Sequence, residues 1–226
     1  MARASLSEHV KDQRARQAHE LANSGPFVTI SRQFGCHGFS LGLLLLEILN
    51  EETEGAAWRI YHKDILARLA TETNLAAGLI EQERRSKPSM IVDFFRSLKK
   101  DRMPSGYEIR NRITVIIRGL AVQGHAIIIG QGGAGATQDL PNGLTVRLEA
   151  PEEWRIKQVA FREGLNEAQA RQLVREKESE REYLRKLYET RFPRKPAFHI
   201  TYDCSAFPLA HIAQHIAHMM RLTKCV

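Results

Sequence analysis

The chain has 226 residues, of which 43% are hydrophobic and 26% are charged, a balance typical of a soluble globular protein. Its 33 Lys and Arg exceed its 26 Asp and Glu and give a formal net charge of +7, so polyanions such as nucleoside phosphates or nucleic acid are suitable partners. The most apolar run, LGLLLLEIL at 41–49, is shorter than a membrane span of about 20 residues.

The amino terminus lacks the hydrophobic core of a secretory signal, so a cytoplasmic protein is expected. The three cysteines, Cys36, Cys204 and Cys225, have no metal-ligand spacing, and reduced thiols inside a cell fit them best. No basic strand carries interleaved aromatic residues of the RNA-binding kind. A nucleic-acid partner would therefore rest on net charge alone, and we expect neither nucleic acid nor a membrane as partner.

In chain order, the apolar runs and turn signals predict strands that alternate with helices, and hence a parallel α/β sheet of about five strands with helices on both faces. A separate helix is expected over 1–25, ahead of a single domain over 26–226. The predicted strands are 27–31, 58–62, 126–130, 145–150 and 198–204. The predicted helical segments are 39–50, 63–124 with two interruptions, the stretch after Pro151, 166–190 and 208–221.

Residues 29–42, TISRQFGCHGFSLG, have the layout of a phosphate-binding loop between a strand and a helix. Glycines allow the backbone to curl around a phosphate, and the free N–H groups of the helix start attract anions. When Gly38 is set on the second glycine of G-x-x-x-x-G-K-[ST], Ser40 falls on the magnesium-binding hydroxyl and Phe39 on the lysine. Gln33 then replaces the first glycine, so the motif alone also fits a plain strand–turn–helix.

Several stretches in the correct order resemble the cytidylate kinase-like family over about 27–220. FVTISRQFGCHGFSLG is similar to its S-R-Q-[FY]-G-[SC]-G-G loop, RIYHKDIL to its second strand end, and AIIIGQGG to its strand with a Gly-Arg-Gly turn. LPNGLTVRLEAPEEWRIKQV, REKESEREYLRKLYE and FHITYDCSAF are similar to its next strand and helix, its arginine-bearing lid helix and its closing strand.

The resemblance implies a P-loop NTPase-like fold with a helical nucleotide-binding lobe over about 63–124 and a helical lid over about 165–195. It implies a nucleoside monophosphate kinase that uses ATP and Mg²⁺ to phosphorylate a nucleotide or another small acceptor. The alternative is a catalytically inactive nucleotide-binding sensor or regulatory protein. Neither function identifies the acceptor or the oligomeric state. A homo-oligomer is compatible with the sequence.

The same resemblance assigns residues to roles. The lid arginines Arg181 and Arg185, together with Arg32, are expected to act on the transferring phosphoryl group, and Ser40 is expected to bind Mg²⁺. The expected nucleotide-phosphate contacts are Gly35, Cys36, His37, Gly38, Phe39 and Ser40. The expected acceptor contacts are His62, Asp64, Arg68, Gly130 and Gln131.

The chain departs from the family at three of these positions: Phe39 replaces a cation, His62 an Asp, and Gln131 an Arg. Each functional assignment also has a structural alternative. Arg32 fits an ion-paired surface arginine at a strand end, and the alternating charges of the lid fit a solvated helix face. Asp64 and Arg68 fit a plain i,i+4 ion pair.

Overall fold

The structure is a computed structural model that describes residues 25–52, 55–64, 106–189 and 198–223. The helix expected over 1–25, most of the lobe expected over 63–124, and the end of the lid lie outside the described residues. The strands are β1 (Phe27–Arg32), β2 (Arg59–Tyr61), β3 (Ala126–Ile129), β4 (Gly143–Glu149) and β5 (Ile200–Asp203). The helices are α2 (Gly38–Glu52), α6 (Gly106–Gln123), α7 (Gly133–Ala136), α8 (Glu152–Glu163), α9 (Glu167–Glu189) and α10 (Leu209–Leu222).

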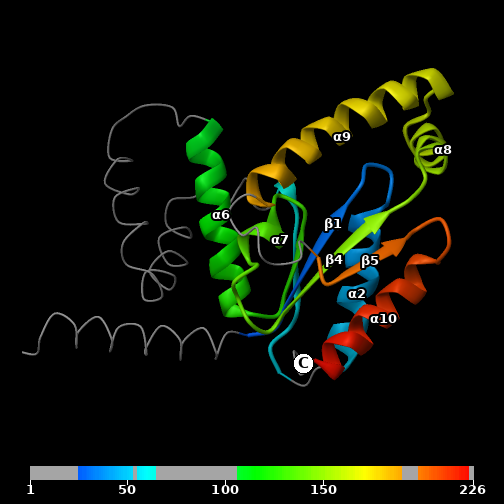
Figure 1. The fold of residues 1–226 in the computed structure, drawn as a ribbon. Coiled ribbons are helices and arrows are strands. Elements are labelled where there is room, and N and C mark those ends of the chain that lie inside the picture. Colours follow the sequence, from blue (N-terminus) through cyan, green and yellow to red (C-terminus); the bar gives the residue numbers. More distant parts are fainter. Residues whose placement is uncertain (1–24, 53–54, 65–105, 190–197, 224–226) are drawn as a thin grey trace, which may run out of the picture.

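The five strands form one parallel sheet in the order β2-β3-β1-β4-β5 (Figure 1). All five predicted strands are confirmed within a few residues, and the expected α/β class is therefore correct. The short helix α7 was not predicted, because its sequence GAGA carries no helical apolar pattern. Within the described ranges, no helix has the length and apolar character needed to cross a membrane.

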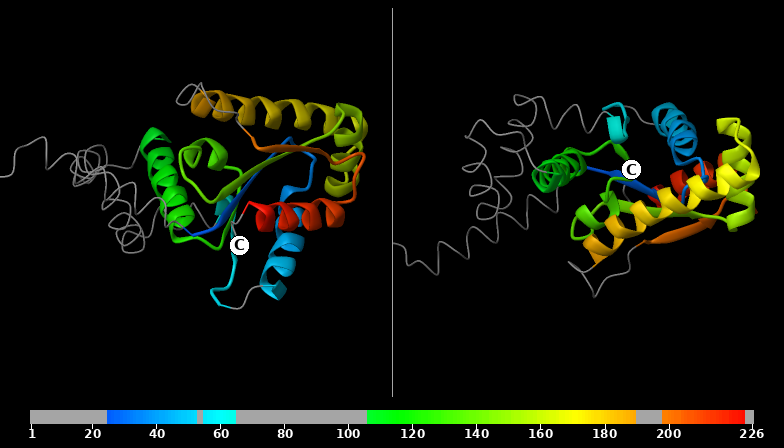
Figure 2. Two further views of the ribbon diagram at one scale, coloured as in Figure 1. Left: turned by 60° about the horizontal axis from the view of Figure 1, so that its bottom comes forward. Right: turned by 90° about the horizontal axis from the view of Figure 1, so that it is seen from above.

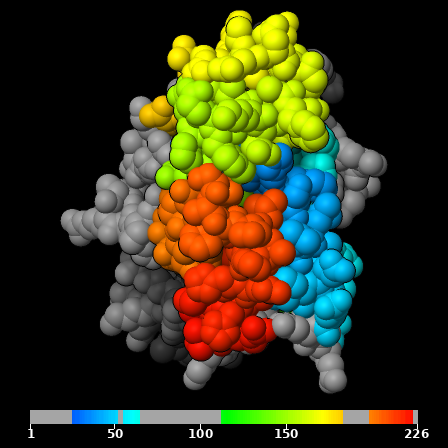
Figure 3. Space-filling model, turned by 90° about the vertical axis from the view of Figure 1, so that its right-hand side faces the viewer, coloured from blue at the N-terminus to red at the C-terminus, as the bar shows by residue number. Residues whose placement is uncertain are grey.

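Helices cover both faces of the sheet (Figure 2). On β1, Val28 and Ile30 pack into the core formed with α2 and α10, whereas Phe27 packs into the core formed with α6 and α7. This split follows from the alternation of side chains along a strand. Because both faces are covered, β3 consists entirely of buried residues, as is typical of a parallel sheet. Figure 3 shows α2 and α10 side by side on one surface of the molecule, with α8 beyond them.

Helices α8 and α9 form a hairpin. Gly164 ends α8 with a φ of 65°, and Asn166 and Gln169 then exchange side-chain to backbone hydrogen bonds of 3.1 and 3.0 Å at the start of α9, an arrangement that caps helix starts. Apolar side chains of both helices, including Val159 and Val174, form a small separate core. The hairpin extends α9 across the carboxyl ends of the strands (Figure 1).

The connections after β1 and β3 leave the sheet on opposite faces. The chain after β1 enters α2 on one face, and the chain after β3 enters α7 on the other. Ligands of open α/β sheets bind in the crevice at such a switch point, outside the carboxyl ends of the strands. The fold therefore places the candidate site between the loop at 33–37 and the turn at 130–132.

Candidate functional site

The loop after β1 is fixed by its contacts with β4 and α8. Gln33 donates its N–H to the carbonyl of Leu148 at 2.9 Å, and its side-chain oxygen accepts the N–H of Ala150 at 3.0 Å. Gly35 has a φ of 97°, and a Cβ there would lie 2.9 Å from the Cβ of Arg155. A residue other than glycine would meet both backbone strain and a close contact at this point.

Most N–H groups of this loop have no acceptor among the residues that the structure describes. Phe34 donates to Glu178, and Cys36 donates to the Gln33 carbonyl. The helix α2 begins at Gly38, and the first N–H groups of any helix have no intrahelical acceptor. Oriented N–H groups of this kind form concave anion sites. In the described part of the chain, no acceptor is present for the N–H groups of Gly35, His37, Gly38, Phe39 and Ser40.

Arg32 extends from the end of β1 into the switch-point crevice. Its side chain passes Gly38, where a Cβ would lie 3.0 Å from the Arg32 Cδ, and its Nη1 occupies the space that a Cβ on Gly130 would need. Arg32 is partly buried here, and its guanidinium forms no ion pair within the described residues. Burial lowers the pKa of Arg32 to about 10, and the nearby positive charge of Arg181 adds to this effect. The two glycines make room for a guanidinium group.

Arg181 reaches the same place from α9. Its Nη1 donates to the carbonyl oxygen of Arg32 at 3.3 Å, and its guanidinium lies 5.0 Å from the center of the Phe34 ring. Burial is the main cause that lowers the pKa of Arg181. Helix α9, the expected lid, is thus in contact with the loop.

These two cations differ from the other buried arginines near them. Arg147 pairs with Glu149 and donates to the Ser31 hydroxyl. Arg155 donates to two carbonyl oxygens and lies 3.6 Å from the Glu178 carboxylate. By contrast, neither guanidinium of Arg32 and Arg181 forms an ion pair with a carboxylate within the described residues. The charge of Glu178 acts on both guanidinium groups and offsets part of their cost. Because Glu178 also pairs with Arg155, the two desolvated cations are only partly compensated, and an anionic ligand would lower their remaining cost.

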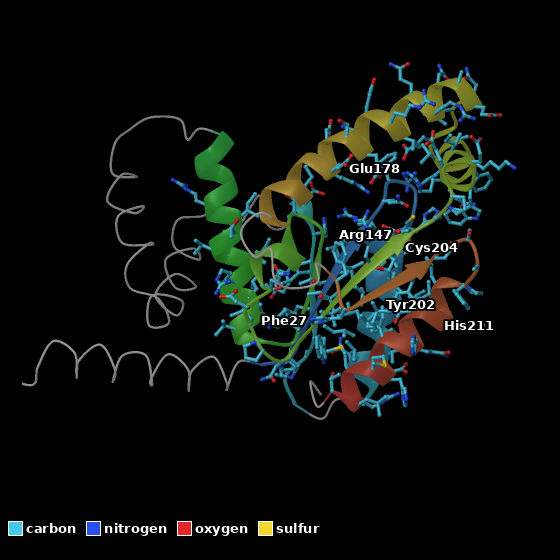
Figure 4. All side chains as sticks on the ribbon, in the orientation of Figure 1. Phe27, Arg147, Glu178, Tyr202, Cys204 and His211 are labelled. Atoms are coloured by element: carbon cyan, nitrogen blue, oxygen red, sulfur yellow. The ribbon has the colours of Figure 1, made fainter. Side chains whose placement is uncertain are left out.

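Glu178 attaches α9 to the loop. Its carboxylate accepts the Phe34 N–H at 2.7 Å and lies 3.6 Å from Arg155 Nη1. Figure 4 shows the Glu178 side chain below α9, at the end of the sheet opposite to Phe27. Because a carboxylate is a strong acceptor, this hydrogen bond is worth about 1.5–3 kcal/mol. It holds α9 at the position where Arg181 meets Arg32.

We predict that Glu178→Ala speeds hydrogen exchange at the Phe34 amide and lowers the free energy of unfolding by about 1–2 kcal/mol, because the amide loses a charged acceptor. Glu180→Ala is the matched control: Glu180 lies on the same helix but is exposed and pairs with Lys177. Amide exchange and urea unfolding measure the two effects. Equal rates of amide exchange at Phe34 in both variants would show that the Glu178 contact does not hold α9 against the loop.

The turn after β3 is formed by three successive residues with positive φ. Gly130, Gln131 and Gly132 have φ values of 69°, 53° and 73°. For a residue with a Cβ, this conformation costs about 1 kcal/mol or more. Gln131 has this cost, whereas the two glycines do not. Gln131 has an uncharged side chain, whereas the guanidinium of Arg32 lies over Gly130. The positive charge at this turn therefore comes from Arg32.

Gly130→Ala is expected to lower the free energy of unfolding by more than Gly164→Ala does. Both changes place a Cβ at a positive φ, which costs about 1 kcal/mol, but only the Cβ at Gly130 displaces the Arg32 guanidinium. Gly164 is the control, since it has nearly the same φ of 65° and no atom lies within 4 Å of the added Cβ. Chemical denaturation measures both changes. Equal loss of stability in the two variants would contradict this position of Arg32.

Two predicted loop contacts have side chains directed away from the crevice. Cys36 is fully buried in the core, next to Cys204. A hydrogen bond from Cys204, assisted by the charge of Arg155, lowers the pKa of the Cys36 thiol, and the same pair raises the pKa of Cys204. His37 turns toward α8, where its Nε2 lies 3.1 Å from the side-chain oxygen of Gln158. Both residues can offer only backbone groups to a ligand.

Phe39 and His62 meet on the other side of the loop, with ring centers 5.0 Å apart. Ser40, beside Phe39, is exposed in the first turn of α2. Asp64 is also exposed and lies 3.5 Å from the Nδ1 of His62. Arg68 and the side chain of Arg185 lie outside the described residues, so their expected roles stay predictions.

The structure therefore brings together Arg32, Arg181, the loop backbone over 35–40 and Gly130. Two anchoring contacts were missed from the sequence: the bond from Ala150 to the Gln33 side chain, and the bond from Phe34 to Glu178. Glutamine at the position of the first loop glycine was one available signal for the first contact.

Comparisons with known proteins give a family match and similar solved structures. The model of the cytidylate kinase-like family matches residues 27–206. Among solved structures, an uncharacterized protein from Eubacterium ventriosum is 17% identical with a TM-score of 0.64, over 87% of this chain and 98% of that one. The protein TT1252 from Thermus thermophilus is 16% identical with a TM-score of 0.45, over 88% of this chain and 98% of that one. A comparison with curated proteins finds no significant match.

Proposed function

Because the chain belongs to the cytidylate kinase-like family, we propose that it binds ATP at the loop over 35–40 and transfers the γ-phosphoryl group to a nucleoside monophosphate or another small acceptor. The observation that carries this proposal is the pair Arg32 and Arg181, two desolvated cations that form no direct ion pair within the described residues and lie beside loop N–H groups that have no acceptor there. Phosphoryl transfer depends mainly on positioning and on the neutralisation of charge around the transferred group.

Each part of the site has a role in this proposal. The N–H groups of the loop bind the donor phosphates. Arg32 supplies, from the sheet, the positive charge that a loop lysine supplies elsewhere, since Phe39 cannot. Arg181 supplies a second charge from α9, which already contacts the loop, so two forked donors lie around the γ-phosphoryl group when ATP binds.

Mg²⁺ would neutralise the donor phosphates, and the exposed hydroxyl of Ser40 in the first turn of α2 is the group suited to bind it. No cluster of three metal-ligating side chains exists in the described part of the chain. The ion would therefore keep waters and phosphate oxygens as its other ligands, as Mg²⁺ often does. Because Ser40 contributes one neutral ligand, the metal would be bound mainly through the nucleotide.

A second candidate function is a nucleotide sensor without turnover. The exposed apolar ring of Phe39 at the lysine position favours it, and so does the uncharged Gln131 in the turn after β3. In this case Arg32 and Arg181 would bind phosphate and hold the lid closed. Binding of the nucleotide would then stabilise one conformation of the protein, and that conformation would be the signal.

The two functions are separated by ADP formation from Mg-ATP with a panel of nucleoside monophosphates. Acceptor-dependent turnover, above that of ATP alone, supports the kinase. No turnover together with an ATP-dependent rise in melting temperature refutes the kinase and supports the sensor. Neither turnover nor a rise in melting temperature refutes both functions.

A further inference from the structure

Phe39 is an exposed aromatic residue at the center of a polar site. Its side chain is 46% exposed in the first turn of α2, between Gly38 and Ser40. Helix α2 crosses over β2 and β3, because a Cβ on Gly42 would lie 2.7 Å from side-chain atoms of both Ile60 and Ile129. The start of this helix therefore brings the Phe39 ring to the carboxyl ends of those two strands.

His62, which follows β2, supports the ring from the side. The two ring centers lie 5.0 Å apart with an angle of 77° between the planes, the edge-to-face geometry that aromatic pairs favour. The Nδ1 of His62 faces Asp64, with its backbone nitrogen at 3.4 Å and its carboxylate at 3.5 Å. The Nε2 has no partner among the described residues. The pair thus has an aromatic surface and a free polar edge.

The aromatic pair and the Arg32 guanidinium lie at the carboxyl ends of neighbouring strands, because His62 follows β2 and Gly130 follows β3. The Arg32 guanidinium lies over Gly130 at the end of β3, and β3 lies between β1 and β2 in the sheet. The pair approaches this position from the β2 side, whereas Arg181 approaches the loop from α9. A molecule bound here would meet a cation and an aromatic ring at neighbouring points.

We propose that Phe39, supported by His62, is the surface on which the planar ring of a phosphate ester stacks, so that it selects ring-bearing acceptors such as nucleotides over ring-less phosphate esters. This inference rests on the proposed function for the position of the phosphate. Stacking on an aromatic side chain removes apolar surface from water and accepts any base, because every base has a π-face. The residue that replaces the loop cation would thereby serve recognition of the acceptor.

The test compares CMP with ribose 5-phosphate, which keeps the sugar and phosphate but lacks the base. Calorimetric titration of the full chain is expected to give a dissociation constant about tenfold lower for CMP. Phe39→Leu should reduce this ratio to about 1–2 and leave binding of ribose 5-phosphate within about twofold. Phe39→Tyr should keep the ratio, because it keeps the aromatic face.

Leu43→Ala is the matched control, because Leu43 is also 46% exposed and lies one turn further along α2. Its CMP to ribose 5-phosphate ratio should equal that of the native chain. An unchanged ratio in Phe39→Leu, or an equal loss in Leu43→Ala, would overturn the stacking role. If the native chain binds both esters equally but transfers phosphate, the stacking role is refuted and the proposed kinase function stands. If it binds CMP selectively but shows no turnover, phosphoryl transfer is refuted and the stacking role stands.

Discussion

Replacing Arg32 with methionine is expected to weaken ATP binding about 100-fold and, at the same time, to raise the free energy of unfolding by about 1 kcal/mol. A guanidinium that donates two charge-assisted hydrogen bonds to phosphate contributes about 3 kcal/mol, which corresponds to that change in affinity. The gain in stability follows because burial and the neighbouring Arg181 make the charged side chain costly in the folded protein.

Methionine has a similar unbranched stem and keeps the packing of the Arg32 stem against Gly38. Isothermal titration with ATP and urea unfolding measure the two quantities. Arg59→Met is the control, since Arg59 is exposed on β2, and it should change neither quantity. A variant at Arg32 that loses stability but binds ATP normally would show that this arginine is structural.

Arg181→Gln is expected to lower the turnover of ATP about 1000-fold, the size of effect that a second arginine has in phosphoryl transfer. Glutamine lacks the charge and ends two bonds short of the Nη1 that donates to the Arg32 carbonyl, whereas the hydrogen bond from Phe34 to Glu178 still holds α9 against the loop. The melting temperature should therefore change little. Arg181→Lys should recover only part of the activity, because an ammonium group lacks the planar fork of Arg.

The control for this variant is Arg175→Gln on the same helix, because the side chain of Arg175 is 68% exposed and lies near Glu152 rather than near the loop. Steady-state ADP formation measures the effect. Equal turnover in the native chain and Arg181→Gln would remove Arg181 from the catalytic group. A fall in turnover that is fully explained by weaker ATP binding would assign it to binding alone.

The strands of this fold could be predicted from the sequence because each is a short apolar run followed by a turn signal. Strand β3, for example, is buried on both faces and is therefore a continuous run of apolar residues, a pattern that is visible in the local sequence. Helix α8 was predicted for a similar local reason, since proline favours the position before or at a helix start. The short α7 was missed because four small residues have no periodicity.

The candidate site could be predicted only in part. The loop and the lid arginine follow from motif order, but the position of the Arg32 guanidinium depends on the pairing of β1 with β3, about 100 residues away in sequence. The bond between Phe34 and Glu178 joins residues 144 positions apart. Such long-range contacts leave no periodic signal in one sequence, and neither does the meeting of Phe39 with His62.

The central claim is that the loop over 35–40, Arg32 and Arg181 together form a phosphate site. Hydrogen exchange of the native chain, measured by mass spectrometry with and without Mg-ATP, tests it most directly. We predict slower exchange in peptides that contain residues 33–40 and in those around Arg181, because the free N–H groups acquire acceptors and the bound phosphate gives Arg181 an anionic partner that stabilises α9 against the loop. Unchanged exchange in the loop at saturating ATP, or protection confined to other segments, would contradict it.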